Sequence, residues 1–178
     1  MNAERLVGLL SGGFHALFEW DAELFDLGTD GVNEQTITFR LGLYLHGLFE
    51  GYHVDCEYNR IWDKPKACQR AEKQSMKPDV IIHRRRSDTE NLFCLEAKKD
   101  YLWNHAETGY ADMEKKLVGL THPEDRYKYI LGAAWRIMPT PDPSQHRCFW
   151  FINGAKVLET SLWGFEGEVI ETLRRIHG

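Results

Sequence analysis

The chain has 178 residues, of which 43% are hydrophobic and 28% are charged, a composition that fits one ordinary domain with a buried core. Its net charge of −5 argues against a broad, sequence-independent grip on nucleic acid. No apolar run approaches the roughly 20 residues that a membrane-spanning helix needs, and the first residues lack the features of a signal peptide. We therefore expect a cytoplasmic protein with no membrane partner.

The charge is unevenly distributed along the chain. Residues 57–86 carry nine Lys or Arg and four Asp or Glu, which gives this segment a net charge of +5. A local basic patch is compatible with a phosphate-bearing substrate, although a solvated loop would have the same composition. The cysteines and histidines do not follow the close spacing of a metal site, so we interpret them as buried thiols and structural side chains.

The pattern of apolar residues predicts helices and strands that alternate along the chain. Helices are predicted over residues 3–27 (in two pieces, broken or kinked at Ser11-Gly12-Gly13), 33–50 (capped by Asp30 or Asn33), 112–120 and 165–176. Strands are predicted over residues 53–58, 80–84, 92–97, 129–137 (or a passage from helix to strand) and 147–152, the last closed by Asn153-Gly154. This order indicates a single α/β domain over residues 1–178, with a mixed central sheet flanked by helices.

We divide that domain into three parts. Residues 1–30 are expected to be an N-terminal helical extension, residues 33–152 the core, and residues 165–177 a C-terminal helix. Residues 61–77 form a long polar stretch without a clear period, and loops of this length are usually functional or mobile.

The most informative stretch combines two carboxylates and a lysine. Pro78-Asp79 opens one apolar strand, Glu96-Ala97-Lys98 closes the next, and a polar turn joins them. Side chains two residues apart on a strand share a face, so Glu96 and Lys98 are expected to point the same way. Folding the hairpin about its turn brings Asp79 within one to three residues of direct register with Glu96, which is close enough for side-chain contact.

This arrangement favours a metal site. Two carboxylates that lie close together repel one another and lose hydration beside apolar strands. A magnesium ion would relieve both costs, because it prefers hard oxygen ligands. Lys98 would then orient or deprotonate a water molecule, or neutralise charge in the transition state. Glu34 shares the apolar face of its predicted helix. It either joins this site or merely complements the positive end of the helix dipole.

At these residues the chain resembles the PD-(D/E)XK nuclease superfamily, which has the restriction-endonuclease-like fold. Glu34, Pro78-Asp79 and Glu96-Ala97-Lys98 occur in the family's order, and the resemblance covers residues 33–99 well and the continuation to residue 152 loosely. It implies an αβββαβ core in which Asp79, Glu96 and the Ala97 carbonyl bind Mg²⁺ or Mn²⁺. It also implies that Lys98 serves the attacking water and that Glu34 is an auxiliary acid.

Residues that contact nucleic acid are less sharply predicted. Tyr58, Asn59 and Arg60 follow a predicted strand and would stack on a base or hold a phosphate, or simply cap the strand. Some family members carry Gln-x-x-x-Tyr on the helix after the motif, and this chain does not. Lys115 and Lys116 on that helix would contact phosphate or lie on a solvated face.

The sequence thus leaves two functions open. One is a Mg²⁺-dependent nuclease that acts on DNA, with RNA the less favoured substrate. The other is a module that keeps the nuclease fold without catalysis and binds nucleic acid or a protein partner. A homodimer is compatible with both.

Overall fold

The computed structural model describes residues 1–26, 32–57, 60–61, 64–65, 77–87, 90–105 and 109–177, and residues 60–61 and 64–65 are described by their backbone alone. The helices are α1 (Ala3–Trp20), η1 (Ala22–Phe25), α2 (Glu34–Leu48), η2 (Asp100–Leu102), α3 (Tyr110–Thr121) and α4 (Glu166–His177). The strands are β1 (His53–Cys56), β2 (Arg60–Ile61), β3 (Lys64–Pro65), β4 (Val80–His83), β5 (Asn91–Lys99), β6 (Leu131–Ile137), β7 (Arg147–Ile152) and β8 (Ala155–Ser161).

Six of these strands form one sheet in the order β1-β4-β5-β6-β7-β8. Strands β5 and β6 are parallel, and the other neighbouring pairs in this sheet are antiparallel. The connection between the parallel strands contains α3, as a parallel crossover requires. The predicted α/β class, with a mixed sheet and flanking helices, is confirmed.

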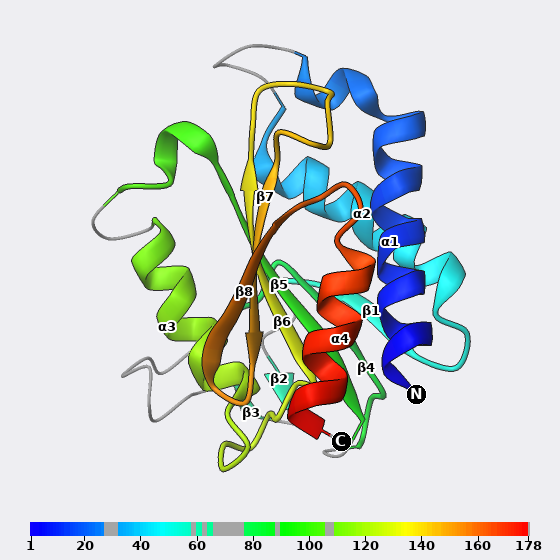
Figure 1. Cartoon of the computed structure of the whole chain (residues 1–178), viewed down its shortest axis with the longest axis vertical. Helices are drawn as coiled ribbons and strands as arrows, with labels where there is room; N and C mark the ends of the chain where they lie inside the picture. The colour runs from blue at the N-terminus through cyan, green and yellow to red at the C-terminus, as the bar shows by residue number, and fades with distance from the viewer. Residues whose placement is uncertain are drawn as a thin grey trace.

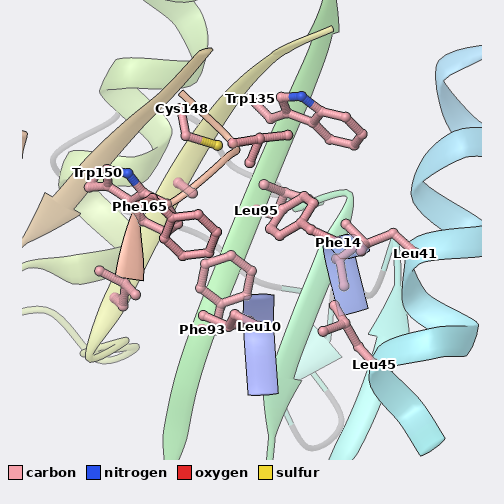
Figure 2. Packing of buried hydrophobic residues seen from close by; sticks show 14 of the residues in the cluster. Leu10, Phe14, Leu41, Leu45, Phe93, Leu95, Trp135, Cys148, Trp150 and Phe165 are labelled. Atoms are coloured by element: carbon pink, nitrogen blue, oxygen red, sulfur yellow. The ribbon is translucent and has the colours of Figure 1, made fainter. Parts of the chain in front are cut away.

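Helices cover both faces of the sheet. Figure 1 shows α3 on one side and α1, α2 and α4 on the other. The alternation along β5 explains this division, since Phe93, Leu95 and Ala97 belong to the larger core cluster with α1, α2 and α4, whereas Cys94 belongs to the smaller cluster with α3. Figure 2 shows the larger cluster, in which the Phe14 ring meets the Trp135 ring edge-on at a centroid distance of 5.4 Å.

The predicted break in the first helix is wrong. Helix α1 runs without interruption through Ser11-Gly12-Gly13, and its buried face packs in the larger core cluster. A Cβ atom on Gly13 would lie 2.4 Å from Leu45 of α2. The glycine therefore serves close packing between two helices, which outweighs its low helix propensity.

Strand β8 is an element that the sequence interpretation missed. Asn153 and Gly154 both have positive φ angles, of 51° and 76°, and they connect β7 to β8 so that Ile152 lies opposite Ala155. Positive φ at both central residues is the signature of a two-residue hairpin turn, and Asn-Gly is its strongest sequence signal. The strand lies at the edge of the sheet, and its residues are exposed or half-buried except for the buried Thr160, so it lacks the apolar run that marked the other strands.

The long helix begins as the sequence predicts and ends at Leu48, two residues before the predicted end. The Asn33 side chain accepts a hydrogen bond from the Gln35 backbone N–H at 3.1 Å, which satisfies one of the free donors at the start of α2. Asn33 is therefore the cap, and the alternative cap Asp30 lies outside the described residues. Gly51 follows the helix with a φ of 81°. In the described part of the chain, no helix has both the length and the apolar character that crossing a membrane requires.

Candidate functional site

The β4–β5 hairpin sets the positions of the two strand carboxylates. Val80 pairs with Leu95. Asp79 and Glu96 are the next residues beyond this pair, at the open end of the hairpin. The Asp79 backbone N–H donates to the Leu95 carbonyl at 3.0 Å, and the Ala97 backbone N–H donates to Asp79 Oδ2 at 2.7 Å. The expected proximity of the two acids is confirmed, since Asp79 lies one residue before the start of β4 and bonds to the two residues that flank Glu96.

Both carboxylates lie on the side of the sheet that α3 covers. Ile81 and Cys94, two residues inward on each strand, pack in the smaller cluster with α3, and side chains two apart share a face. Glu96 is only 3% exposed. Burial, and then the nearby Asp79 charge, raise the pKa of Glu96 to about 8. Burial likewise raises the pKa of Asp79 to about 6, although the Ala97 donor opposes this change.

Lys116 of α3 is the cation that meets these acids. Its Nζ donates to Glu96 Oε2 at 2.9 Å and lies 3.6 Å from Asp112 Oδ2, one helical turn earlier. Burial by itself lowers the pKa of Lys116, but Glu96 outweighs this effect and the net shift is upward. The second oxygen, Glu96 Oε1, is buried and has no hydrogen-bond partner among the residues that the structure describes.

Lys98 forms a separate ion pair with Glu34. Its Nζ donates to Glu34 Oε1 at 2.8 Å, and the Lys99 backbone N–H donates to Glu34 Oε2 at 2.7 Å. The Lys98 and Glu34 side chains are 19% and 18% exposed. Glu34, the first residue of α2, therefore binds both the side chain and the backbone at the end of β5. The structure brings Glu34, Asp79, Glu96 and Lys98 to one end of the β4–β5 hairpin, where Lys98 is paired with Glu34 and not with the two strand acids.

The residues predicted to contact nucleic acid have different outcomes. Tyr58 and Asn59 lie outside the described residues, and Arg60 is described only as part of β2, where it pairs with Pro65. Lys115 is exposed on α3. For Lys116 the solvated-face interpretation is wrong, because its side chain is 19% exposed and paired with Glu96.

Sequence reasoning missed the link between Lys116 and Glu96. A signal was present, because Met113, Leu117 and Leu120 form the buried stripe of α3 and Lys116 lies three residues after Met113. A lysine at this spacing borders the helix face that packs on the sheet. Nothing in the sequence named Glu96 as its partner, since 20 residues separate the two.

A second polar cluster lies near the far end of β4. His83 Nε2 is 2.8 Å from Asp55 Oδ2, and Arg85 also pairs with Asp55. Burial favours the neutral form of Asp55, but His83 and Arg85 outweigh it and hold the pKa of this carboxyl well below its usual range. These contacts tie β1 to β4, in agreement with a structural role for His83.

The side chains of the site supply part of what a metal ion needs. Among the described residues, no group of three or more His, Cys, Asp or Glu side chains is arranged to hold a metal. The two strand acids nevertheless fit a hard cation with further ligands from backbone, phosphate and water. Glu96 Oε1 lacks a partner within the described chain, and burial disfavours the charged forms of both acids, so a cation would stabilise this pair.

Comparison with known proteins adds no relative. No protein-family model matches the chain, and searches of curated proteins and of solved structures returned no match. What the site does is inferred from this chain's own residues.

Proposed function

We propose that the protein is a metal-dependent nuclease of the PD-(D/E)XK type, which hydrolyses phosphodiester bonds with Mg²⁺ or Mn²⁺. DNA is the proposed substrate, and RNA is the less favoured alternative. The observation that carries the proposal is the pair formed by Asp79 and Glu96. Asp79 bonds to the Leu95 carbonyl and to the Ala97 N–H, the backbone groups on either side of Glu96, and the buried Glu96 has an oxygen without a partner in the described chain. Such a pair is costly unless a cation is bound.

In this proposal Asp79, Glu96 and the Ala97 carbonyl hold the ion. When bound, a divalent ion polarises the phosphate and lowers the pKa of a coordinated water molecule. The hydrogen bond from the Ala97 N–H fixes the orientation of the Asp79 carboxylate. Because this donor belongs to the strand that carries Glu96, the two acids are held in a fixed relation.

Lys98 supplies positive charge beside the carboxylates. Its ammonium is held by Glu34, so its position depends on the start of α2. From there Lys98 orients the attacking water or neutralises charge on the phosphate. Glu34 acts through Lys98 and is therefore a positioning residue. The net charge of +5 over residues 57–86 supports a phosphate-bearing substrate.

The test is cleavage of plasmid DNA, single-stranded DNA and RNA in Mg²⁺, in Mn²⁺ and in EDTA. Asp79→Asn keeps an acceptor for the Ala97 N–H and removes the charge, and Lys98→Met removes the ammonium. Both are expected to reduce cleavage by about a hundredfold or more, the usual scale for such groups. Glu171→Gln and Arg175→Met make the same charge changes at exposed positions of α4 and are expected to leave cleavage unchanged. Equal cleavage by all four variants would refute the proposal.

A second function is favoured by a different observation. Glu34 pairs with Lys98, and Glu96 pairs with Lys116, so lysines of the protein already balance two of the three site carboxylates. A nuclease fold that had lost catalysis and binds nucleic acid or a protein partner would have the same pairs. Calorimetric titration separates the two functions: nucleic-acid binding without uptake of millimolar Mn²⁺ would support the module.

A further inference from the structure

Lys116 contacts the candidate site but has no part in the proposed chemistry. Its Nζ donates to Glu96 Oε2 at 2.9 Å, and its side chain is 19% exposed. Lys98, the lysine of the sequence motif, is bound to Glu34 instead. The ammonium in direct contact with a strand carboxylate therefore comes from α3.

One ammonium acts on two acids and can balance the charge of only one of them. Lys116 is bonded to Glu96, and it also favours the charged form of Asp79 more strongly than Lys98 does. A divalent ion between the two carboxylates would have the same electrostatic role. Two cations that serve the same pair of carboxylates repel each other, and this repulsion is strong where water is largely excluded.

Asp112 offers the ammonium an alternative partner. Its Oδ2 lies 3.6 Å from Lys116 Nζ, on the same helix and one turn earlier. A lysine ammonium sits on a flexible four-carbon chain, so it can leave Glu96 and remain paired with Asp112 without a change in the backbone. The Glu96 oxygen that Lys116 now occupies would then be available to another cation.

We propose that Lys116 is a built-in competitor for the metal, which holds Glu96 in the metal-free protein and moves toward Asp112 when a divalent ion binds. This inference rests on the proposed function, because it needs Asp79 and Glu96 to be metal ligands. It assigns Lys116 the role of setting metal affinity, and Asp112 that of receiving the displaced ammonium. A helix packed against the sheet thereby regulates access to the carboxylates.

The test compares Lys116→Met with Lys115→Met. Both variants remove one lysine charge from α3, but Lys115 is exposed and Lys116 contacts Glu96. MnCl₂ is titrated calorimetrically into each protein at about pH 8. Loss of a charge beside the ion is expected to tighten Mn²⁺ binding by about tenfold or more in Lys116→Met and to leave Lys115→Met unchanged. Protons also gain affinity for Glu96 in this variant, but Coulomb energy scales with charge, so the divalent ion gains more.

Thermal unfolding in EDTA and in MnCl₂ gives a second measurement. Without metal, Lys116→Met leaves Glu96 buried without its bonded cation and is expected to unfold at a lower temperature than wild type. Added Mn²⁺ is expected to raise its unfolding temperature by more than it raises that of wild type, because tighter binding stabilises the folded state more.

The outcomes distinguish this inference from the proposed function. If wild type binds Mn²⁺ and cleaves nucleic acid, but Lys116→Met binds Mn²⁺ no more tightly, competition is refuted and the nuclease stands. If Lys116→Met instead loses affinity for nucleic acid with unchanged Mn²⁺ binding, Lys116 is a phosphate contact and the inference is again overturned. If neither protein takes up Mn²⁺, both the inference and the metal-dependent function fail.

Discussion

Neutralising Asp79 is expected to stabilise the metal-free protein. In the substitution Asp79→Asn, the side chain keeps an oxygen that accepts from the Ala97 N–H, so the hydrogen bond is retained while the charge is lost. Most substitutions at partly buried polar positions destabilise a protein. The opposite sign here follows from burial of a carboxylate beside Glu96, which makes the charged form unfavourable in the absence of metal.

The size of the effect follows from the pKa of Asp79. Burial raises it from 3.8 to about 6, and a change of this size corresponds to about 3 kcal/mol at most. Because the folded state holds the proton more tightly, the wild type loses this stability as pH rises from the unfolded pKa through the folded pKa. Asp79→Asn should therefore match wild type near about pH 4 and exceed it by up to about 3 kcal/mol near about pH 8.

Urea unfolding in EDTA, followed by tryptophan fluorescence, measures this difference. Contributions from titrating groups remote from Asp79 largely cancel when the two proteins are compared at each pH. Asp21→Asn is the matched control, because Arg40 Nε donates to Asp21 at 2.7 Å and holds the pKa of that carboxyl below its ordinary value. Asp21→Asn should therefore lower the free energy of unfolding by about 1 kcal/mol or more.

The reasoning is refuted if Asp79→Asn is less stable than wild type at the higher pH in EDTA. It is also refuted if the difference between the two proteins does not depend on pH. Millimolar Mn²⁺ should reverse the order, because the ion stabilises only a protein that binds it.

Two further predictions concern the fold. Gly13→Ala places a methyl group 2.4 Å from Leu45 and is expected to lower the free energy of unfolding in urea by about 1–3 kcal/mol. Gly8→Ala on the same helix meets nothing within 4 Å and should raise the free energy of unfolding by about 0.5–1 kcal/mol. Equal effects of the two substitutions would contradict the close packing of α1 on α2. Burial lowers the pKa of His146 from 6.5 to about 4, so the unfolded state takes up its proton first and stability should fall by up to about 3 kcal/mol as pH drops through this window. In His146→Gln, which keeps an acceptor for Trp135 Nε1, the free energy of unfolding should fall less steeply as the pH is lowered. An equally steep fall would rule out His146 as the cause.

The β4–β5 hairpin could be predicted because its information is local. Apolar residues on both strands and a polar turn between them indicate the pairing, and Val80 pairs with Leu95, which brings Asp79 near Glu96. Helix α2 was equally accessible, since Asn33 caps it and its buried stripe has helical spacing. Strand β8 was not, because an edge strand with few buried residues has little periodicity to detect.

The ion pairs were beyond the sequence for a different reason. Lys98 and Glu34 are 64 residues apart, and Lys116 and Glu96 are 20 apart. The motif suggests that Lys98 serves the strand carboxylates, yet the packing of α2 and α3 decides which lysine meets which acid. The same principle explains Gly13, whose role depends on Leu45 of another helix and not on its own propensity.

These pairings give the two lysines different roles and make them separable by experiment. Removing Lys98 frees Glu34, which is 18% exposed and can be hydrated, so its effect on stability should be modest. Removing Lys116 leaves Glu96, at 3% exposure, with no bonded cation, so its effect should be larger and relieved by metal. If the site binds a divalent ion, a variant at Lys98 should therefore lose cleavage and keep metal affinity, whereas a variant at Lys116 should change metal affinity. If the variants at Lys98 and Lys116 had identical effects on cleavage and on metal affinity, the two ion pairs would not act as separate units.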